Sequence, residues 1–343
     1  MEQIAWIIGP VHIYWSAVVR MLASAAAICL FLALYLRKED RAAGAAVCVP
    51  TAVILSMLLS RLAHWYFLPD RYENMKVALN LFQPGGFVLM GAFAGCFSAA
   101  LILRLLQIVK DLPDLLDCMC IGGSLGIAVG RLACWFNGTD RGMTVAESLG
   151  LPWACPVVNP VSGIEEYRLA TFLIQAMTAA VICLVLLLVW AAESRKGIYR
   201  SGDVTLLFLL CYGASQILLD STRYDSLSFR SNGFIHVVQV LGAGAMVLVA
   251  VVYAGRLVYA QGWKGKQLLL WIPQLLCFAL AGYMEYYVQR HGDEAVFAYS
   301  LMSGALLGIV FLVCLTRILA RWAEKKRKQQ MFEMADSWER GMP

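Results

Sequence analysis

Arg131 lies inside an apolar segment of the chain, where a guanidinium group could bind an anion. It follows three glycines spaced four residues apart over residues 122–130, which place a smooth stripe on one helix face and let a neighbouring helix come close. A charge within a membrane span is costly, so the side chain must face protein or water and needs an anionic partner. Residue type leaves three alternatives open: an ion pair with an acid such as Asp117 or Asp220, snorkelling toward the interface, or a phosphate held by the forked guanidinium donors.

A second polar group follows later in the chain. Gln216, Asp220 and Arg223 are spaced by four and three residues, which places all three on one helix face. Asp220 and Arg223 can simply pair with each other, which is the plainer account. His236 and Gln239 open the next apolar segment, and a lone histidine at a membrane interface is more often a hydrogen-bonded structural residue than a base.

The composition places these residues in a membrane protein. The 343-residue chain is 60% hydrophobic and only 15% charged, whereas a soluble domain carries about a quarter charged residues. A helix needs about 20 mostly apolar residues to span a bilayer, and lipid offers no partner for free backbone groups. The sequence therefore predicts an all-α, polytopic transmembrane helix bundle of about nine spans, at residues 12–36, 44–67, 85–108, 114–136, 168–192, 203–221, 233–255, 267–288 and 296–319.

The basic residues flanking these spans predict their orientation. Lysine and arginine accumulate on one set of connections, at residues 37–41 (including Lys38), 104–110, 195–200, 256–266 and from 321 onward. Because cytoplasmic loops carry the excess of basic residues, we expect the N-terminus outside and the C-terminus in the cytoplasm, which requires an odd number of spans.

Cysteines and net charge exclude other classes. Most of the eleven cysteines lie in apolar runs, and Cys118 and Cys120 have no histidine or second cysteine pair nearby, so we expect no metal site. The formal charge of +5 comes without an aromatic-interleaved basic stripe, so we expect contact with anionic lipid and no nucleic acid.

Four blocks of the sequence, in order, resemble motifs of the bacterial prolipoprotein diacylglyceryl transferases. The family patterns are Gly-Pro-x-x-Ile-Arg-Trp-Tyr-Gly, Gly-Gly-x-x-x-His-Gly-Gly, Gly-Arg-x-Gly-Asn-Phe-x-Asn-Gly and Tyr-Gly-x-x-Arg-x-x-x-Glu-x-x-Arg. They resemble GPVHIYWSA at residues 9–17, GGFVLMGA at 85–92, GRLACWFNG at 130–138 and YGASQILLDSTR at 212–223.

The resemblance covers about residues 9 to 255, the first seven spans, and the family has seven spans with the N-terminus outside. It implies a seven-span, transferase-like bundle over residues 1–260, two additional transmembrane helices over 261–320 and a basic cytoplasmic tail over 321–343.

Several positions depart from the family pattern. Met90 replaces the histidine, Gln216 an arginine, Ser16 a tyrosine and Cys134 an asparagine, and residues 169–175 replace a His-Pro-Ser-Gln-Leu-Tyr-Glu block. The pattern is kept at Arg131, Asn137, Gly138, Gly142, Arg223 and Gln239, with Asp220 as a shorter acid.

The resemblance implies an activity: transfer of a diacylglyceryl group from phosphatidylglycerol to the lipobox cysteine thiol of a prolipoprotein, in lipoprotein maturation at the bacterial cytoplasmic membrane. Its partners would be phosphatidylglycerol or another anionic phospholipid and the prolipoprotein signal peptide, without a cofactor. The catalytic residues it implies are Arg131, Arg223 and Asp220, and the substrate-binding residues are Asn137, Gly138, Gly142, Gln239 and Gln216.

Two other functions stay open. Methionine cannot move a proton, so Met90 also fits a relative that binds phospholipid as a scaffold or uses another acceptor. Intramembrane charges would permit a small-molecule transporter, but the odd number of spans and the absence of a detectable duplication disfavour one.

Overall fold

The structure, a computed structural model, describes residues 3–9, 11–37, 41–80, 86–158, 163–223, 226–229, 232–291 and 294–341. Lys38, Pro10 and Gly85, which the sequence analysis singled out or included in a motif, lie outside these ranges.

Long helices dominate the described residues, and each of the nine predicted apolar segments contains one. They are α1 (Trp15–Tyr35), α2 (Ala42–Phe67), α4 (Leu89–Leu105), α5 (Leu112–Arg131), α7 (Thr171–Arg195), α8 (Asp203–Ser221), α9 (Val237–Gln261), α10 (Leu268–Arg290) and α11 (Ala295–Gly341). Within the described ranges, eight are long and apolar enough to cross a membrane, while α4 is shorter, with 17 residues. The predicted all-α polytopic fold is confirmed, and the orientation of the termini stays a prediction.

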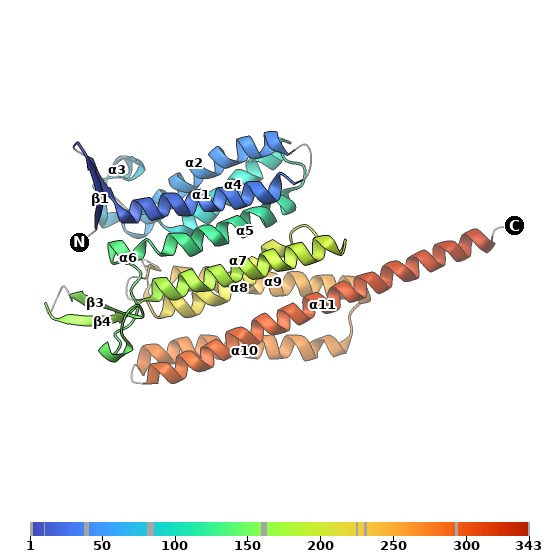
Figure 1. Cartoon of the computed structure of the whole chain (residues 1–343). Helices are drawn as coiled ribbons and strands as arrows, with labels where there is room; N and C mark the ends of the chain where they lie inside the picture. Colours follow the sequence, from blue (N-terminus) through green and yellow to red (C-terminus); the bar gives the residue numbers. More distant parts are fainter. Residues whose placement is uncertain are drawn as a thin grey trace. The chain divides into compact units, whose positions relative to one another are not determined.

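The chain divides into two compact units. One comprises Met1–Phe208 with Thr222–Val240, and the other comprises Leu209–Ser221 with Leu241–Pro343, so the division falls within α8 and α9. In the first unit α2 packs on α4, and α5 packs on both α1 and α7. In the second unit α10 packs on α11 (Figure 1). The predicted division at residue 260 stays a prediction.

Glycine lets α5 approach α1 closely. A Cβ atom added at Gly122 would lie 2.6 Å from the carbonyl oxygen of Ala27, and one at Gly126 would lie 2.9 Å from the Ala27 Cβ. Real Cβ atoms do not come this close to other atoms, so the two helices can pack in this way only with glycine at both positions. The packing role predicted for the glycine stripe is confirmed here.

Short antiparallel hairpins precede two of the helices, where the sequence analysis expected helix. Strand β1 (Ile4–Ile8) pairs with β2 (Val11–Tyr14), and β5 (Ser228–Phe229) pairs with β6 (Asn232–His236). The predicted starts at residues 12 and 233 were therefore wrong: α1 begins at Trp15 and α9 at Val237. Apolar content identified the segments, but the β-branched and aromatic residues of Val11–Tyr14 favour a strand.

The two long connections form small structures at one end of the first unit. Residues 68–84 contain the 3-10 turn η1 (Pro69–Arg71) and the short helix α3 (Met75–Leu79). Residues 137–167 contain η2 (Glu147–Leu149) and the hairpin of β3 (Ala154–Val158) and β4 (Glu165–Leu169). The labelled strands and α3 gather at the end of α5 where Arg131 lies (Figure 1).

The C-terminal basic segment continues the last predicted span. Helix α11 runs without a break for 47 residues, from Ala295 to Gly341, and includes the Lys-Lys-Arg-Lys run. The segment expected as a separate tail is thus an extension of the helix in the described residues.

A carboxylate at the start of α5 holds the start of α8. Asp117 accepts hydrogen bonds from the backbone N–H groups of Gly202, at 2.8 Å, and Thr205, at 2.7 Å, and from the Thr205 hydroxyl at 2.6 Å. Because the first N–H groups of a helix lack partners within the helix and carry partial positive charge, a carboxylate there is stabilising. Asp117 therefore acts as an N-cap supplied by another helix.

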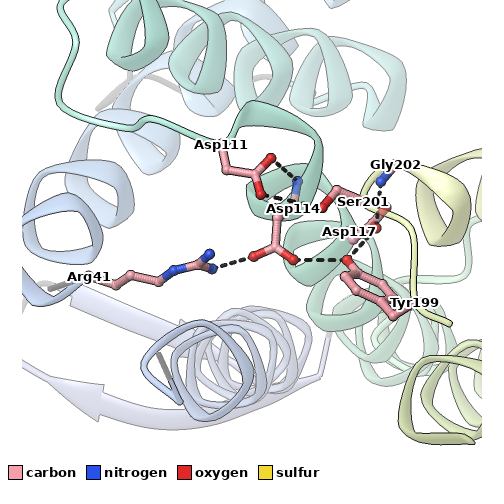
Figure 2. A network of polar contacts seen from close by, with 7 residues as sticks. All are labelled: Arg41, Asp111, Asp114, Asp117, Tyr199, Ser201 and Gly202. Atoms are coloured by element: carbon pink, nitrogen blue, oxygen red, sulfur yellow. Dashed lines mark hydrogen bonds and ion pairs between the residues drawn. The ribbon is translucent and has the colours of Figure 1, made fainter. Parts of the chain in front are cut away.

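Tyr199 joins this cap to a second acid (Figure 2). Its hydroxyl lies 2.6 Å from an Asp117 oxygen and 2.9 Å from an oxygen of Asp114, which also pairs with Arg41. Burial, followed by the two carboxylates, raises the pKa of Tyr199, so the phenol keeps its proton at neutral pH and donates it. The network ties two connections, between α1 and α2 and between α7 and α8, to the first turns of α5.

We expect Asp117→Asn to destabilise the first unit. The amide keeps the size of the side chain but loses the charge, and its N–H₂ group faces N–H donors, so unfolding should cost about 2–3 kcal/mol less. Thermal unfolding in detergent measures this, with Asp70→Asn, at an exposed residue of η1, as the matched control. Equal unfolding temperatures for the two variants would contradict the capping role.

Candidate functional site

The end of α5 positions Arg131 beside a sharp reversal of the chain. Arg131 is the last residue of α5, and the short helix α6 (Cys134–Asn137) follows almost directly. Gly138 ends α6 in the left-handed conformation, with φ of 71°, and the Asn137 side-chain oxygen accepts from the backbone N–H of Thr139 at 3.1 Å. Asn137 and Gly138 therefore build the turn that brings the following residues back toward Arg131.

Asp140 lies at the centre of the site and bridges two arginines. One carboxylate oxygen pairs with Arg131 and the other pairs with Arg223. Asp140 is 6% exposed, and its φ of 56° is unusual for a residue other than glycine. The Cys134 thiol donates to the same carboxylate at 3.1 Å. The observed partner of Arg131 is thus Asp140, not Asp117 as one alternative proposed.

Two opposing effects set the protonation of Asp140. Burial raises the pKa of the carboxyl group, but Arg131 and then Arg223 lower it by more, so the pKa lies below its ordinary value. The group is therefore ionised at neutral pH. Two guanidinium charges with one carboxylate leave the cluster with a net positive charge, which favours a further anion.

Backbone contacts fix the loop that carries Asp140. Gly142 forms an isolated antiparallel bridge with Arg223, and its N–H donates to the Leu169 carbonyl at 2.7 Å. A Cβ added at Gly142 would lie 2.3 Å from the Thr171 hydroxyl oxygen, so the approach requires glycine. The N–H of Phe172, at the start of α7, donates to the Asp140 carbonyl at 3.1 Å. These contacts hold the loop against α7.

The structure brings some of the predicted site residues together and not others. Arg131, Asn137, Gly138, Gly142 and Arg223 surround the Asp140 cluster. Residues Gln216 and Asp220, 4% and 0% exposed, belong to the part of α8 that lies in the other unit. Gln239 lies in the first turn of α9, and His236 ends β6 rather than opening a helix.

Asp140 was not identified from the sequence. It lies nine residues after Arg131, in a Gly-Thr-Asp-Arg-Gly segment that reads as an ordinary surface turn. The available signal is an acid two residues after an Asn-Gly pair that itself follows an intramembrane arginine. Spacing along one helix face could not reveal it, because the turn and not a helix brings Asp140 to Arg131.

Helices able to span a membrane and a paired-arginine site at the end of one of them define a polytopic membrane protein with a site suited to an anionic group. The sequence model of the prolipoprotein diacylglyceryl transferase family matches residues 3–260, and the chain belongs to this family. It is accordingly related to transferases of lipoprotein biosynthesis and is a multi-pass protein of the bacterial cytoplasmic membrane. The match ends before α10, which begins at Leu268.

Curated relatives carry the same family name. The phosphatidylglycerol–prolipoprotein diacylglyceryl transferase of Streptococcus suis (strain 05ZYH33) is 26% identical over 260 residues, 74% of this chain and 91% of the relative. That of Tropheryma whipplei (strain TW08/27) is 26% identical over 220 residues, 62% of this chain and 77% of the relative. That of Synechococcus elongatus is 26% identical over 246 residues, which are 70% of this chain and 83% of the relative.

We expect Asp140→Asn to destabilise the protein strongly. The variant leaves two partly buried guanidinium groups facing each other without their shared carboxylate, which costs about 3–5 kcal/mol in comparable buried pairs. Chemical or thermal unfolding in detergent measures the change, with Glu165→Gln, an exposed acid on β4, as the control. A loss no larger than the control's would show that the bridge does not hold the site.

The stability lost in Asp140→Asn should also depend on pH. Because the folded-state pKa of Asp140 is depressed, its contribution is fully present above the unfolded value of about 3.9 and disappears as the pH falls through the lower folded value. The stability difference between the wild type and Asp140→Asn should therefore stay constant between about pH 5 and 8 and shrink only below about pH 4. A difference that changes near neutral pH would contradict an ionised bridge.

Proposed function

We propose that this protein is a phosphatidylglycerol–prolipoprotein diacylglyceryl transferase, which moves a diacylglyceryl group from phosphatidylglycerol to the lipobox cysteine thiol of an incoming prolipoprotein. Family membership and the names of the relatives support the reaction class. The observation that carries the proposal is the arginine pair on Asp140, which stays positively charged after its internal pairing.

The proposed reaction is a substitution at carbon. The substrate thiol loses its proton, because the thiolate is the nucleophile. The sulfur forms a bond to the glyceryl carbon, the bond from that carbon to the phosphate oxygen breaks, and glycerol phosphate leaves with the electron pair. The proton released by the thiol balances the charge of the products. Negative charge grows on the departing phosphate, so fixed cations beside it lower the barrier.

In this proposal Arg131 and Arg223 hold the phosphate. Their guanidinium groups offer forked donors that match phosphate oxygens, and Asp140 positions both groups before the lipid arrives. Such preorganisation avoids rearrangement of the charges during the reaction. Asp140 is therefore a positioning residue here rather than a group that reacts.

The remaining predicted residues have supporting roles in the proposal. The residues proposed to contact the lipid head group or line its site are Asn137, Gly138, Gly142 and Gln239, which belong to the same unit as the arginine pair. The roles predicted for Asp220 and Gln216, which belong to the other unit, stay predictions. Asn137 and Gly138 build the turn that carries Asp140, so replacing either should disturb the arginine pair as well as any lipid contact.

A complementation assay tests the proposed function. We expect the chain to restore lipoprotein lipidation in bacterial cells depleted of their own transferase. Arg131→Gln and Arg223→Gln should each lower the rate by about 10²–10³, the effect of losing one charge-assisted transition-state contact. Arg71→Gln, at an exposed arginine that ends η1, is the matched control. No lipidation at normal membrane levels of the protein would overturn the proposal.

Met90 favours a second candidate function, a relative that binds phospholipid but uses a different acceptor or has lost transfer. Methionine, the second residue of α4, cannot accept the proton that the family histidine could. If this alternative holds, the wild type does not restore lipidation, whereas Met90→His should raise it above background. Met90→Leu is the control for size. If the wild type restores lipidation and Met90→His restores the same amount or less, the wild type does not lack a base, and this alternative is excluded.

A further inference from the structure

Arg141, which none of the roles above includes, lies between Asp140 and Gly142 with part of its guanidinium group unsatisfied. Its Nε and Nη1 atoms are buried and have no hydrogen-bond partner in the part of the chain that the structure describes. The guanidinium carbon lies 4.7 Å from the centre of the Phe172 ring, so the flat face of the group stacks on an aromatic side chain. The Nε–H and Nη1–H groups at the edge of the guanidinium thus lack an acceptor among the described residues.

Three other arginines of the first unit each pair with a carboxylate. Arg131 and Arg223 share Asp140, and Arg168 pairs with Glu166 at 3.0 Å. No ion pair joins Arg141 to an acid among the described residues. A buried charge without a partner is costly, and natural proteins seldom keep one unless an ion or ligand completes it.

The protein groups around Arg141 do not neutralise it. Burial raises the pKa of the nearby Cys155 thiol, and the charge of Arg141 together with a hydrogen bond from its side chain offsets this only in part, so the thiol stays neutral. Cys155 and Phe172 belong to one buried apolar cluster with Cys134 and Ala170, which supplies no anion. The surroundings thus hold the guanidinium in place but leave its charge uncompensated.

The backbone holds Arg141 next to the arginine pair. The Asp140 carbonyl accepts from the Phe172 N–H, and Gly142 is locked against Leu169 and bridged to Arg223. The residues on both sides of Arg141 are therefore fixed. The guanidinium groups of Arg131 and Arg223 share the carboxylate of Asp140, and Arg141 directly follows Asp140 in the chain.

We propose that Arg141 is a third anion-binding residue, whose unsatisfied Nε–H and Nη1–H groups bind the phosphodiester of an anionic phospholipid at the end of α5. The inference rests on the proposed function in taking lipid as the source of the phosphate. Arg131 and Arg223 are already partly neutralised by Asp140, whereas Arg141 brings a full positive charge. It is a binding residue for the head group and has no assigned role in moving the thiol proton.

Thermal unfolding of the full-length protein in neutral detergent tests this proposal, with phosphatidylglycerol, phosphatidylcholine or inorganic phosphate added at increasing concentration. Phosphatidylglycerol should raise the unfolding temperature of the wild type. Its half-saturating concentration should increase about tenfold or more in Arg141→Gln, as expected for losing hydrogen bonds to a charged group. Arg71→Gln should change it by less than about twofold, because exposed charges contribute little.

Several outcomes would overturn the proposal. Arg141→Gln could lower the unfolding temperature equally with every additive and leave the half-saturating concentration unchanged, which would mean that Arg141 only packs on Phe172. Equal stabilisation by inorganic phosphate would contradict the lipid source. Absence of any effect of phosphatidylglycerol on the wild type would also count against it.

Arg141→Lys keeps the experiment decisive if the glutamine variant does not fold. Lysine keeps the charge but loses the planar fork, so the half-saturating concentration should rise by about threefold or more. An unchanged value in this variant would contradict the proposal. Lipidation in cells separates the two claims: a protein that binds phosphatidylglycerol through Arg141 but restores no lipidation supports this inference and refutes the proposed transfer.

Discussion

The site depends on one carboxylate that two guanidinium groups share. Arg131 ends a helix and Arg223 follows another, so without Asp140 their like charges would push the two segments apart. With Asp140 between them, the cluster is held together and still carries a net positive charge. This sign matters, because a neutral cluster would offer a phosphate no advantage over water. The bridge therefore supplies both the geometry of the site and its preference for anions.

The rest of the first unit keeps α5 in position at both ends. At its start, Asp117 caps α8 and is linked through Tyr199 to Asp114 and Arg41. Along its length, Gly122 and Gly126 allow close contact with α1. At its end, the loop containing Asp140 is bonded to the start of α7. A helix fixed in this way can present Arg131 in one place, which preorganised electrostatic binding requires.

The sequence was sufficient for features that depend on local pattern. Apolar length located nine helices, and the glycine spacing indicated a close helix contact, although it could not name α1 as the partner. Hydrophobicity predicts helix at β2 and β6, because it does not by itself distinguish an apolar strand from the end of an apolar helix.

The partner of Arg131 could not be read from spacing, because it is set by a turn. Asn137 and Gly138 reverse the chain, and only then does Asp140 face the arginine. The same holds for Gly142, whose requirement for glycine comes from Thr171, far along the chain. Arg141 resembles any loop arginine until the burial of its N–H groups is known. Tertiary contacts, not residue type, distinguish these positions.

A double-mutant cycle on phosphatidylglycerol binding tests the central claim most directly. The half-saturating lipid concentration would be measured for the wild type, Arg131→Gln, Arg223→Gln and the double variant in detergent. If both guanidinium groups hold one phosphate beside the shared Asp140, each single change should weaken binding strongly. The rise in half-saturating concentration for the double variant should then be clearly smaller than the product of the rises for the two single variants. Singles that bind as tightly as the wild type, or losses that multiply independently, would contradict the account.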